Sequence, residues 1–139
     1  MPIQVNTLRR QALSAFIACG FALLAGCQEH AGPELATVTG TVTLDGEPLK
    51  DATLHFQPTS GRPSYGKTDE SGKYNMGYSL ERQGVALGEH KVIIRSVVED
   101  KYGKTLRQEM LPRKYHDQTT LSALVEDKAN VIDFDLESK

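Results

Sequence analysis

The chain has 139 residues, of which 39% are hydrophobic and 24% charged, which fits one soluble globular domain and excludes a disordered tail or a bundle of membrane helices. Arg9 and Arg10 are the only charged side chains before position 27, so the rest of the chain has 14 basic residues against 18 acidic ones, a net charge of −4. Because nucleic-acid binding depends on a basic surface, this balance argues against a nucleic-acid partner.

Residues 1–26 have the pattern of an export signal peptide. A polar stretch ends in the two arginines, and residues 12–24 are then almost all apolar. That run suits the apolar part of a signal peptide and is shorter than the roughly 20 residues that a membrane-spanning helix needs. An uncleaved membrane anchor over residues 11–26 is the alternative.

The apolar run ends in Leu24-Ala25-Gly26-Cys27, which resembles the lipobox of bacterial lipoproteins. The resemblance implies signal cleavage between Gly26 and Cys27 and a diacylglycerol on the Cys27 thiol. The alternative is an ordinary secretory cut after Ala25 or Gly26. That cut would leave a lone free thiol, because no cysteine follows Cys27.

The residue after the predicted lipid site is Gln28 and not Asp. By resemblance to lipoprotein sorting in Gram-negative bacteria, this implies an address in the cell envelope, lipid-anchored to the outer membrane and facing the periplasm or the cell surface. Residues 27–36 are predicted to be a flexible tether, and the folded domain is predicted over residues 37–139.

The domain is predicted to consist of β-strands. Apolar and polar residues alternate with period two, which indicates strands with one buried face, and turn-forming residues separate them. The predicted strands cover residues 37–44, 52–57, two short segments around a turn at 69–72, 88–95, 121–125 and 131–136. Seven such strands favour an all-β fold, a seven-stranded antiparallel β-sandwich of Ig-like type.

Residues 97–119 are the part of the domain without a strand pattern. Long charged loops of this kind are usually functional or loosely ordered. The loop contains a basic and aromatic cluster that is the candidate binding site, formed by Arg113, Lys114, Tyr115 and His116. In the alternative interpretation the loop only closes the sandwich, with Tyr115 packed against it.

Several segments resemble a known family. Residues 38–42, 45–49, 52–56, 68–74 and 88–94 are similar to carboxypeptidase regulatory-like domains, over about residues 37–96. The resemblance implies a transthyretin-like, seven-stranded sandwich. The segments 111–115 and 131–136 resemble the small lipoproteins of this type in planctomycete bacteria. The shared residues are turn formers and core apolar residues, so the resemblance implies a fold more than an activity.

The histidines and tyrosines are candidates for a metal site, because intradiol dioxygenases hold iron with two residues of each type on a related sandwich. Tyr115 and His116 are the one adjacent pair, and no second pair repeats at metal-ligand spacing. The serines lie in no recognisable triad motif, and residues 69–72 fit a plain β-turn better than a calcium loop. The sequence therefore predicts no catalytic residue, no metal site and no cofactor.

Together these patterns predict a non-enzymatic cell-envelope lipoprotein whose β-sandwich serves binding, adhesion or assembly. Its partners would be the membrane, through the lipid on Cys27, and a protein or glycan of the envelope. Binding would use a sheet edge, a sheet face or the 97–119 loop. The alternatives are a metal-dependent, intradiol dioxygenase-like ring-cleaving enzyme and a purely structural envelope component.

Overall fold

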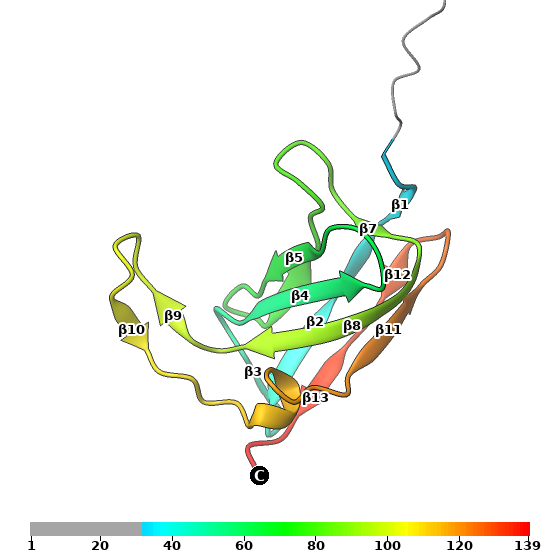
Figure 1. Cartoon of the computed structure of the whole chain (residues 1–139). Coiled ribbons are helices and arrows are strands. Elements are labelled where there is room, and N and C mark those ends of the chain that lie inside the picture. Colours follow the sequence, from blue (N-terminus) through cyan, green and yellow to red (C-terminus); the bar gives the residue numbers. More distant parts are fainter. Residues whose placement is uncertain (1–31) are drawn as a thin grey trace, which may run out of the picture. The chain divides into compact units, whose positions relative to one another are not determined.

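The structure, a computed structural model, describes residues 32–139 (Figure 1). The predicted signal peptide, its cleavage site at Gly26 and the Cys27 thiol lie outside these residues. In the described part the fold is all-β, apart from one turn of 3-10 helix, η1, at Arg113–Tyr115. No helix of residues 32–139 is long and apolar enough to cross a membrane. The strands are β1 (Leu35–Ala36), β2 (Val38–Leu44), β3 (Glu47–Pro48), β4 (Thr53–Pro58), β5 (Ser64–Lys67), β6 (Lys73–Asn75), β7 (Val85–Ala86), β8 (Gly88–Arg95), β9 (Val98–Glu99), β10 (Thr105–Arg107), β11 (Ser122–Val125), β12 (Asn130–Val131) and β13 (Phe134–Leu136).

One main sheet has four antiparallel strands in the order β11-β8-β4-β5. Its members confirm the strands predicted at 52–57, 88–95 and 121–125. Along β8 the residues alternate between buried and exposed or half-buried, as the period-two pattern requires. The strands predicted around the turn at 69–72 also exist, but they separate: β5 joins this sheet and β6 joins the other.

The second main sheet is built around β2. Strands β3 and β6 pair with β2 in antiparallel sense, whereas β12 and β13 pair with it in parallel sense. The prediction of a wholly antiparallel arrangement is therefore wrong at the C-terminal strand. That strand is also interrupted, because the carboxylate of Asp133 accepts the Thr41 N–H (2.7 Å) between the two short ladders.

A close approach of backbones accompanies this interruption. A Cβ at Gly40 would lie 1.8 Å from the carbonyl oxygen of Ile132, so only glycine fits there. The same oxygen accepts the hydroxyl of Tyr74 at 2.5 Å. Burial raises the pKa of this phenol far above its ordinary value, with a smaller contribution from Asp133, so the hydroxyl keeps its proton and the bond is maintained.

The two main sheets pack face to face. The ring of Phe56 on β4 meets that of Phe134 on β13 edge to face, with 6.2 Å between centroids, and Tyr74 on β6 stacks on Phe134. In Figure 1 the β4–β8 pair accordingly lies across β2. The buried apolar side chains of both sheets form one core, with Val38, Val42, Leu54, Phe56, Met76, Val85, Val92, Ile94, Val125 and Leu136 among its members.

The fold begins before residue 37. Leu35 and Ala36 form β1, which pairs with Ala86 and Val85 of β7, and Ala36 is buried. The tether predicted over residues 27–36 therefore overlaps the folded domain. Strand β1 contains only two residues with no alternation to read, which explains why the sequence pattern did not indicate it.

The 97–119 segment is more regular than predicted. Strands β9 and β10 form a hairpin, which extends to the left in Figure 1. At its turn the Asp100 carboxylate accepts the N–H groups of Tyr102 and Lys104, both at 2.9 Å. The turn predicted at 69–72 is built in the same way, because Asp69 accepts the N–H groups of Ser71 (2.8 Å) and Lys73 (3.0 Å).

Candidate functional site

The predicted binding cluster at residues 113–116 is divided between core and surface. Tyr115 and His116 are only 8% and 7% exposed. The Tyr115 hydroxyl oxygen accepts the Glu137 N–H at 3.0 Å, and Nε2 of His116 lies 3.1 Å from the carbonyl oxygen of Leu111. The Tyr115 hydroxyl therefore attaches η1 to the chain just after β13, as in the alternative interpretation of this loop, while the His116 contact stays within the loop.

Arg113 and Lys114 are the exposed half of the cluster. Arg113 lies 3.8 Å from a carboxylate oxygen of Asp117, and the Lys114 ammonium donates to the carbonyl oxygen of Lys139 at 2.9 Å. These contacts involve side chains open to water, where such pairs contribute little free energy. The four predicted residues do not form one exposed patch, so binding through this segment stays a prediction for its two cations alone.

Two polar anchors, which the sequence did not reveal, hold residues 97–111 of this segment. The first is Glu109, whose Oε1 accepts the Ser96 N–H (2.9 Å), the Ser96 hydroxyl and the Leu111 N–H (3.1 Å). Burial acts to raise the pKa of Glu109, but the hydrogen bonds and the nearby His116 outweigh it, and the pKa lies below its ordinary value. Glu109 is therefore ionised in the fold at neutral pH.

The second anchor is Arg107, at the end of β10. Its guanidinium donates to three backbone carbonyl oxygens, of Ser96 (2.7 Å), Lys50 (3.1 Å) and Asp51 (3.2 Å). These bonds join the base of the hairpin to the connection between β3 and β4. The hydrogen bonds of Oε1 of Glu109 and of the Arg107 guanidinium explain how the segment is held, while Oε2 of Glu109 is buried without a hydrogen-bond partner.

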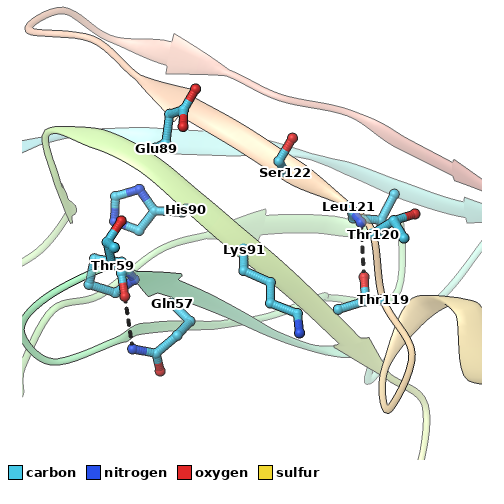
Figure 2. A pocket seen from close by; sticks show the side chains of 10 residues that line it. Gln57, Thr59, Glu89, His90, Lys91, Thr119, Thr120, Leu121 and Ser122 are labelled. Atoms are coloured by element: carbon cyan, nitrogen blue, oxygen red, sulfur yellow. Dashed lines mark hydrogen bonds between the residues drawn. The ribbon is translucent and has the colours of Figure 1, made fainter.

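An open cavity of about 500 Å³ lies over the ends of β4, β8 and β11 (Figure 2). This volume is in the range of ligand sites, which are concave and combine apolar lining with a few polar groups. The lining residues are Gln57, Pro58, Thr59, Glu89, His90, Lys91, Thr119, Thr120, Leu121 and Ser122. We refer to this cavity as the sheet groove.

The polar side chains of the sheet groove come from three neighbouring strands. Gln57 on β4 lies opposite Lys91 on β8, and Lys91 lies opposite Ser122 on β11. Directly opposed residues present their side chains on the same face of a sheet, here the face turned away from the core. Glu89, two residues before Lys91, is on that face too. The groove therefore offers an amide, an ammonium, a hydroxyl and a carboxylate within one row of strands.

Two histidines lie near the sheet groove without being charged sites. His90 is buried, with Nδ1 3.0 Å from the Gly88 carbonyl oxygen, and desolvation lowers its pKa against a smaller opposing effect of that bond. His55 lies on the outer face beside the Tyr65 ring, at a centroid distance of 4.7 Å. Desolvation, with a smaller effect of Arg95, lowers its pKa as well. Desolvation therefore favours the neutral form of both rings.

Within residues 32–139 no group of three His, Cys, Asp or Glu side chains is placed to hold a metal ion. The tyrosines and histidines considered for iron are spread over the fold. Tyr74 and Tyr115 are buried in the core and His55 lies on the outer sheet face.

Comparison with known proteins adds little. The chain matches no protein-family profile and no curated protein sequence. Among solved structures it is similar to a 9R-lipoxygenase from Cyanothece PCC8801, with a TM-score of 0.33 and 18% identity. The match covers 74% of this chain and 16% of the lipoxygenase chain. With so low a score, this likeness supports no conclusion on fold or activity.

Proposed function

We propose that the chain is a non-enzymatic, lipid-anchored protein of the cell envelope whose β-domain binds a partner through the sheet groove. The groove is the observation that carries this proposal. It is large enough for a ligand, and three exposed polar side chains line it, those of Glu89, Lys91 and Ser122. The lipobox supports the anchor, since Cys27 lies only six positions before Pro33, where the compact unit of residues 33–139 begins.

The fold proposed for this module is the seven-stranded, transthyretin-like sandwich of carboxypeptidase regulatory-like domains. Seven principal strands support it: β4, β5, β8 and β11 in one sheet, and β2, β6 and the interrupted β12–β13 strand in the other. The short pairs β1–β7 and β9–β10 and the two-residue β3 would be additions to that plan. In such a family the scaffold is shared and the function depends on sites added to it.

The proposed partner is a protein or glycan of the envelope, and the membrane is reached through the lipid on Cys27. A groove with amide, hydroxyl and ammonium groups suits hydrogen-bonding ligands such as a glycan or an extended peptide. The proposed location is the outer membrane, on its periplasmic or outer surface, because Gln28 follows the lipidated cysteine.

The anchor is tested by intact mass spectrometry of the N-terminal peptide of membrane-extracted protein, beside a Cys27→Ala variant. We expect a peptide that begins at Cys27 with diacylglycerol attached, and a variant that leaves the membrane fraction or stays unprocessed. A wild-type protein that begins elsewhere, carries no lipid and is found in the soluble fraction would contradict the anchor. Stoichiometric iron in the same preparation would instead favour the ring-cleaving alternative.

The groove is tested by photo-cross-linking in cells, with a photoreactive residue at position 91 and a control at position 73. Both positions are exposed lysines in strands, but Lys91 lines the groove and Lys73 lies on β6 in the other sheet. We expect a defined adduct from position 91 and none from position 73. Equal adducts from both positions, or none from position 91, would contradict binding in the groove.

A further inference from the structure

The connection between β6 and β7 ends in a closed loop with Leu80 at its tip. The N–H groups of Tyr78 and Ser79 both donate to the carbonyl oxygen of Arg82, at 2.9 and 3.0 Å, and the Arg82 N–H donates to the Ser79 hydroxyl oxygen at 3.1 Å. These bonds hold the loop shut below its tip. The Leu80 side chain is therefore held fully exposed on an ordered loop.

The side chains beside Leu80 have the chemistry of a membrane interface. The guanidinium carbons of Arg62 and Arg82 lie 5.1 and 5.4 Å from the centre of the Tyr78 ring. Arg62, Tyr78 and Leu80 also line a shared hollow of about 320 Å³. Aromatic rings at headgroup level, arginines that reach phosphates and an aliphatic tip are the features by which proteins contact the surface of a bilayer.

The charge of this surface differs from that of the domain. Arg62 and Arg82 place two guanidinium groups around the Tyr78 ring, with the acidic Glu81 at the loop tip and Glu34 next to Pro33, while the chain after the predicted signal peptide is net negative. Anionic lipid headgroups attract such a surface, and the acidic remainder of the domain is repelled by them. The two guanidinium groups beside Tyr78 therefore favour contact of this surface with an anionic leaflet.

The loop also lies where the chain leaves the fold toward the predicted lipid. The Arg82 guanidinium donates to the carbonyl oxygen of Pro33 at 2.8 Å, and β1 pairs with β7 directly after the loop. In Figure 1 this loop and β1 are found at the same end of the domain. Pro33 comes six positions after Cys27, and a fully extended chain over six positions spans at most about 22 Å. A lipid on Cys27 would thus keep this end of the domain close to the leaflet.

We propose that this surface, made of Arg62, Tyr78, Leu80 and Arg82, rests on the leaflet that holds the acyl chains of Cys27. Leu80 enters the acyl boundary, the Tyr78 ring lies among the headgroups and the two guanidinium groups pair with lipid phosphates. The β9–β10 hairpin, which extends to the left in Figure 1, is then left free on the domain. This inference rests on the lipidation proposed above and adds to it an orientation.

The test uses the full lipidated protein, in which acylation of Cys27 and loss of Cys19 with the signal peptide leave no free thiol. A Leu80→Cys variant therefore carries one site for a polarity-sensitive fluorophore, and a Tyr102→Cys variant is the matched control at the hairpin tip, where Tyr102 is 83% exposed. The probe surface is vesicles of phosphatidylethanolamine and phosphatidylglycerol, with and without quenchers on the acyl chains. We expect a shift to shorter wavelength and quenching at position 80, and a water-like spectrum at position 102.

The outcomes separate the two proposals. A vesicle-bound, lipidated protein whose label at position 80 stays in water, or whose two labels behave alike, refutes the orientation alone. A protein whose intact mass shows no lipid refutes the anchor and the orientation with it. An Arg62→Glu variant tests the electrostatic contribution. Quenching at position 80 should fall on the anionic vesicles and stay unchanged on phosphatidylcholine vesicles. The control Lys73→Glu should leave the quenching unchanged on both kinds of vesicle.

Discussion

Replacing Glu109 by Gln should loosen the whole 97–111 segment, because one carboxylate oxygen holds both of its ends. Gln keeps the size and an acceptor oxygen but removes the negative charge, including the 4.0 Å ion pair of Oε2 with Arg95. Three donors converge on Oε1, from Ser96 and Leu111. Hydrogen bonds to a charged group contribute roughly 1.5–3 kcal/mol each against about 0.5–1.5 for neutral ones.

Replacing the charged acceptor by a neutral one therefore costs about 1 kcal/mol of unfolding free energy for each of the three bonds. The Glu109 side chain is 23% exposed, so water screens part of the effect and the expected loss in free energy of unfolding is about 2 kcal/mol. The assay is urea unfolding followed by circular dichroism, since the chain has no tryptophan, together with hydrogen exchange of the segment. Glu99→Gln is the matched control, because Glu99 is exposed on β9 of the same hairpin. Equal stabilities of the two variants would refute the reasoning.

Acid should reduce the difference between wild type and Glu109→Gln. The pKa of Glu109 in the fold lies below its ordinary value of 4.5, so its contribution is complete above about that pH and is lost as the pH falls through the lower, folded-state pKa. Gln does not titrate and loses nothing there. A gap between the two unfolding free energies that stays constant down to the acid transition would show that the charge is not the cause.

Two further changes probe the fold. Thr68→Val removes a buried hydroxyl that accepts a backbone N–H at 2.8 Å and donates to a backbone carbonyl at 2.6 Å, which should lower the free energy of unfolding by about 2–4 kcal/mol. Thr43→Val removes an exposed hydrogen bond and should cost under about 1 kcal/mol. Chemical unfolding of both variants measures the two losses, and equal losses would contradict the prediction. Gly40→Ala would place a Cβ against the Ile132 backbone oxygen, so β2 must move away from the C-terminal strand. Hydrogen exchange of the 130–136 amides should then become faster before that of the β8 amides. Equal protection of both sets of amides would contradict this.

The strands were predictable where one face is buried and the other is not. Alternation along β2 and β8 fixes which side chains face the core, and Val42 and Val92 are buried as that pattern requires. The same reasoning correctly predicted that Phe134 and Leu136 face the core. It did not predict that their strand pairs with β2 in parallel sense. Periodicity carries no information on strand direction, and the short turn at 126–129 takes the chain into the other sheet, where β2 runs the same way.

The candidate site was less predictable, because a list of charges and rings does not show which are buried. Tyr115 and His116 read as a binding cluster with their basic neighbours and instead lie in the core. One missed signal was available: Asp100 and Gly103 repeat the spacing of Asp69 and Gly72, and both pairs form turns of the same type. The sheet groove has no such signal, since Gln57, Lys91 and Ser122 come together only through pairing across three strands.

The parallel ladder between β2 and β13 joins two segments that are 92 residues apart along the chain, as in the bond from Thr43 to Asp135. Such a long separation makes folding slow, because the chain must close a large loop before these contacts stabilise anything. Strand β2, at the centre of the second sheet, also lacks its partners β12 and β13 until residues 130–136 have been synthesised. The chain would therefore remain incompletely folded until nearly all of this domain has been synthesised.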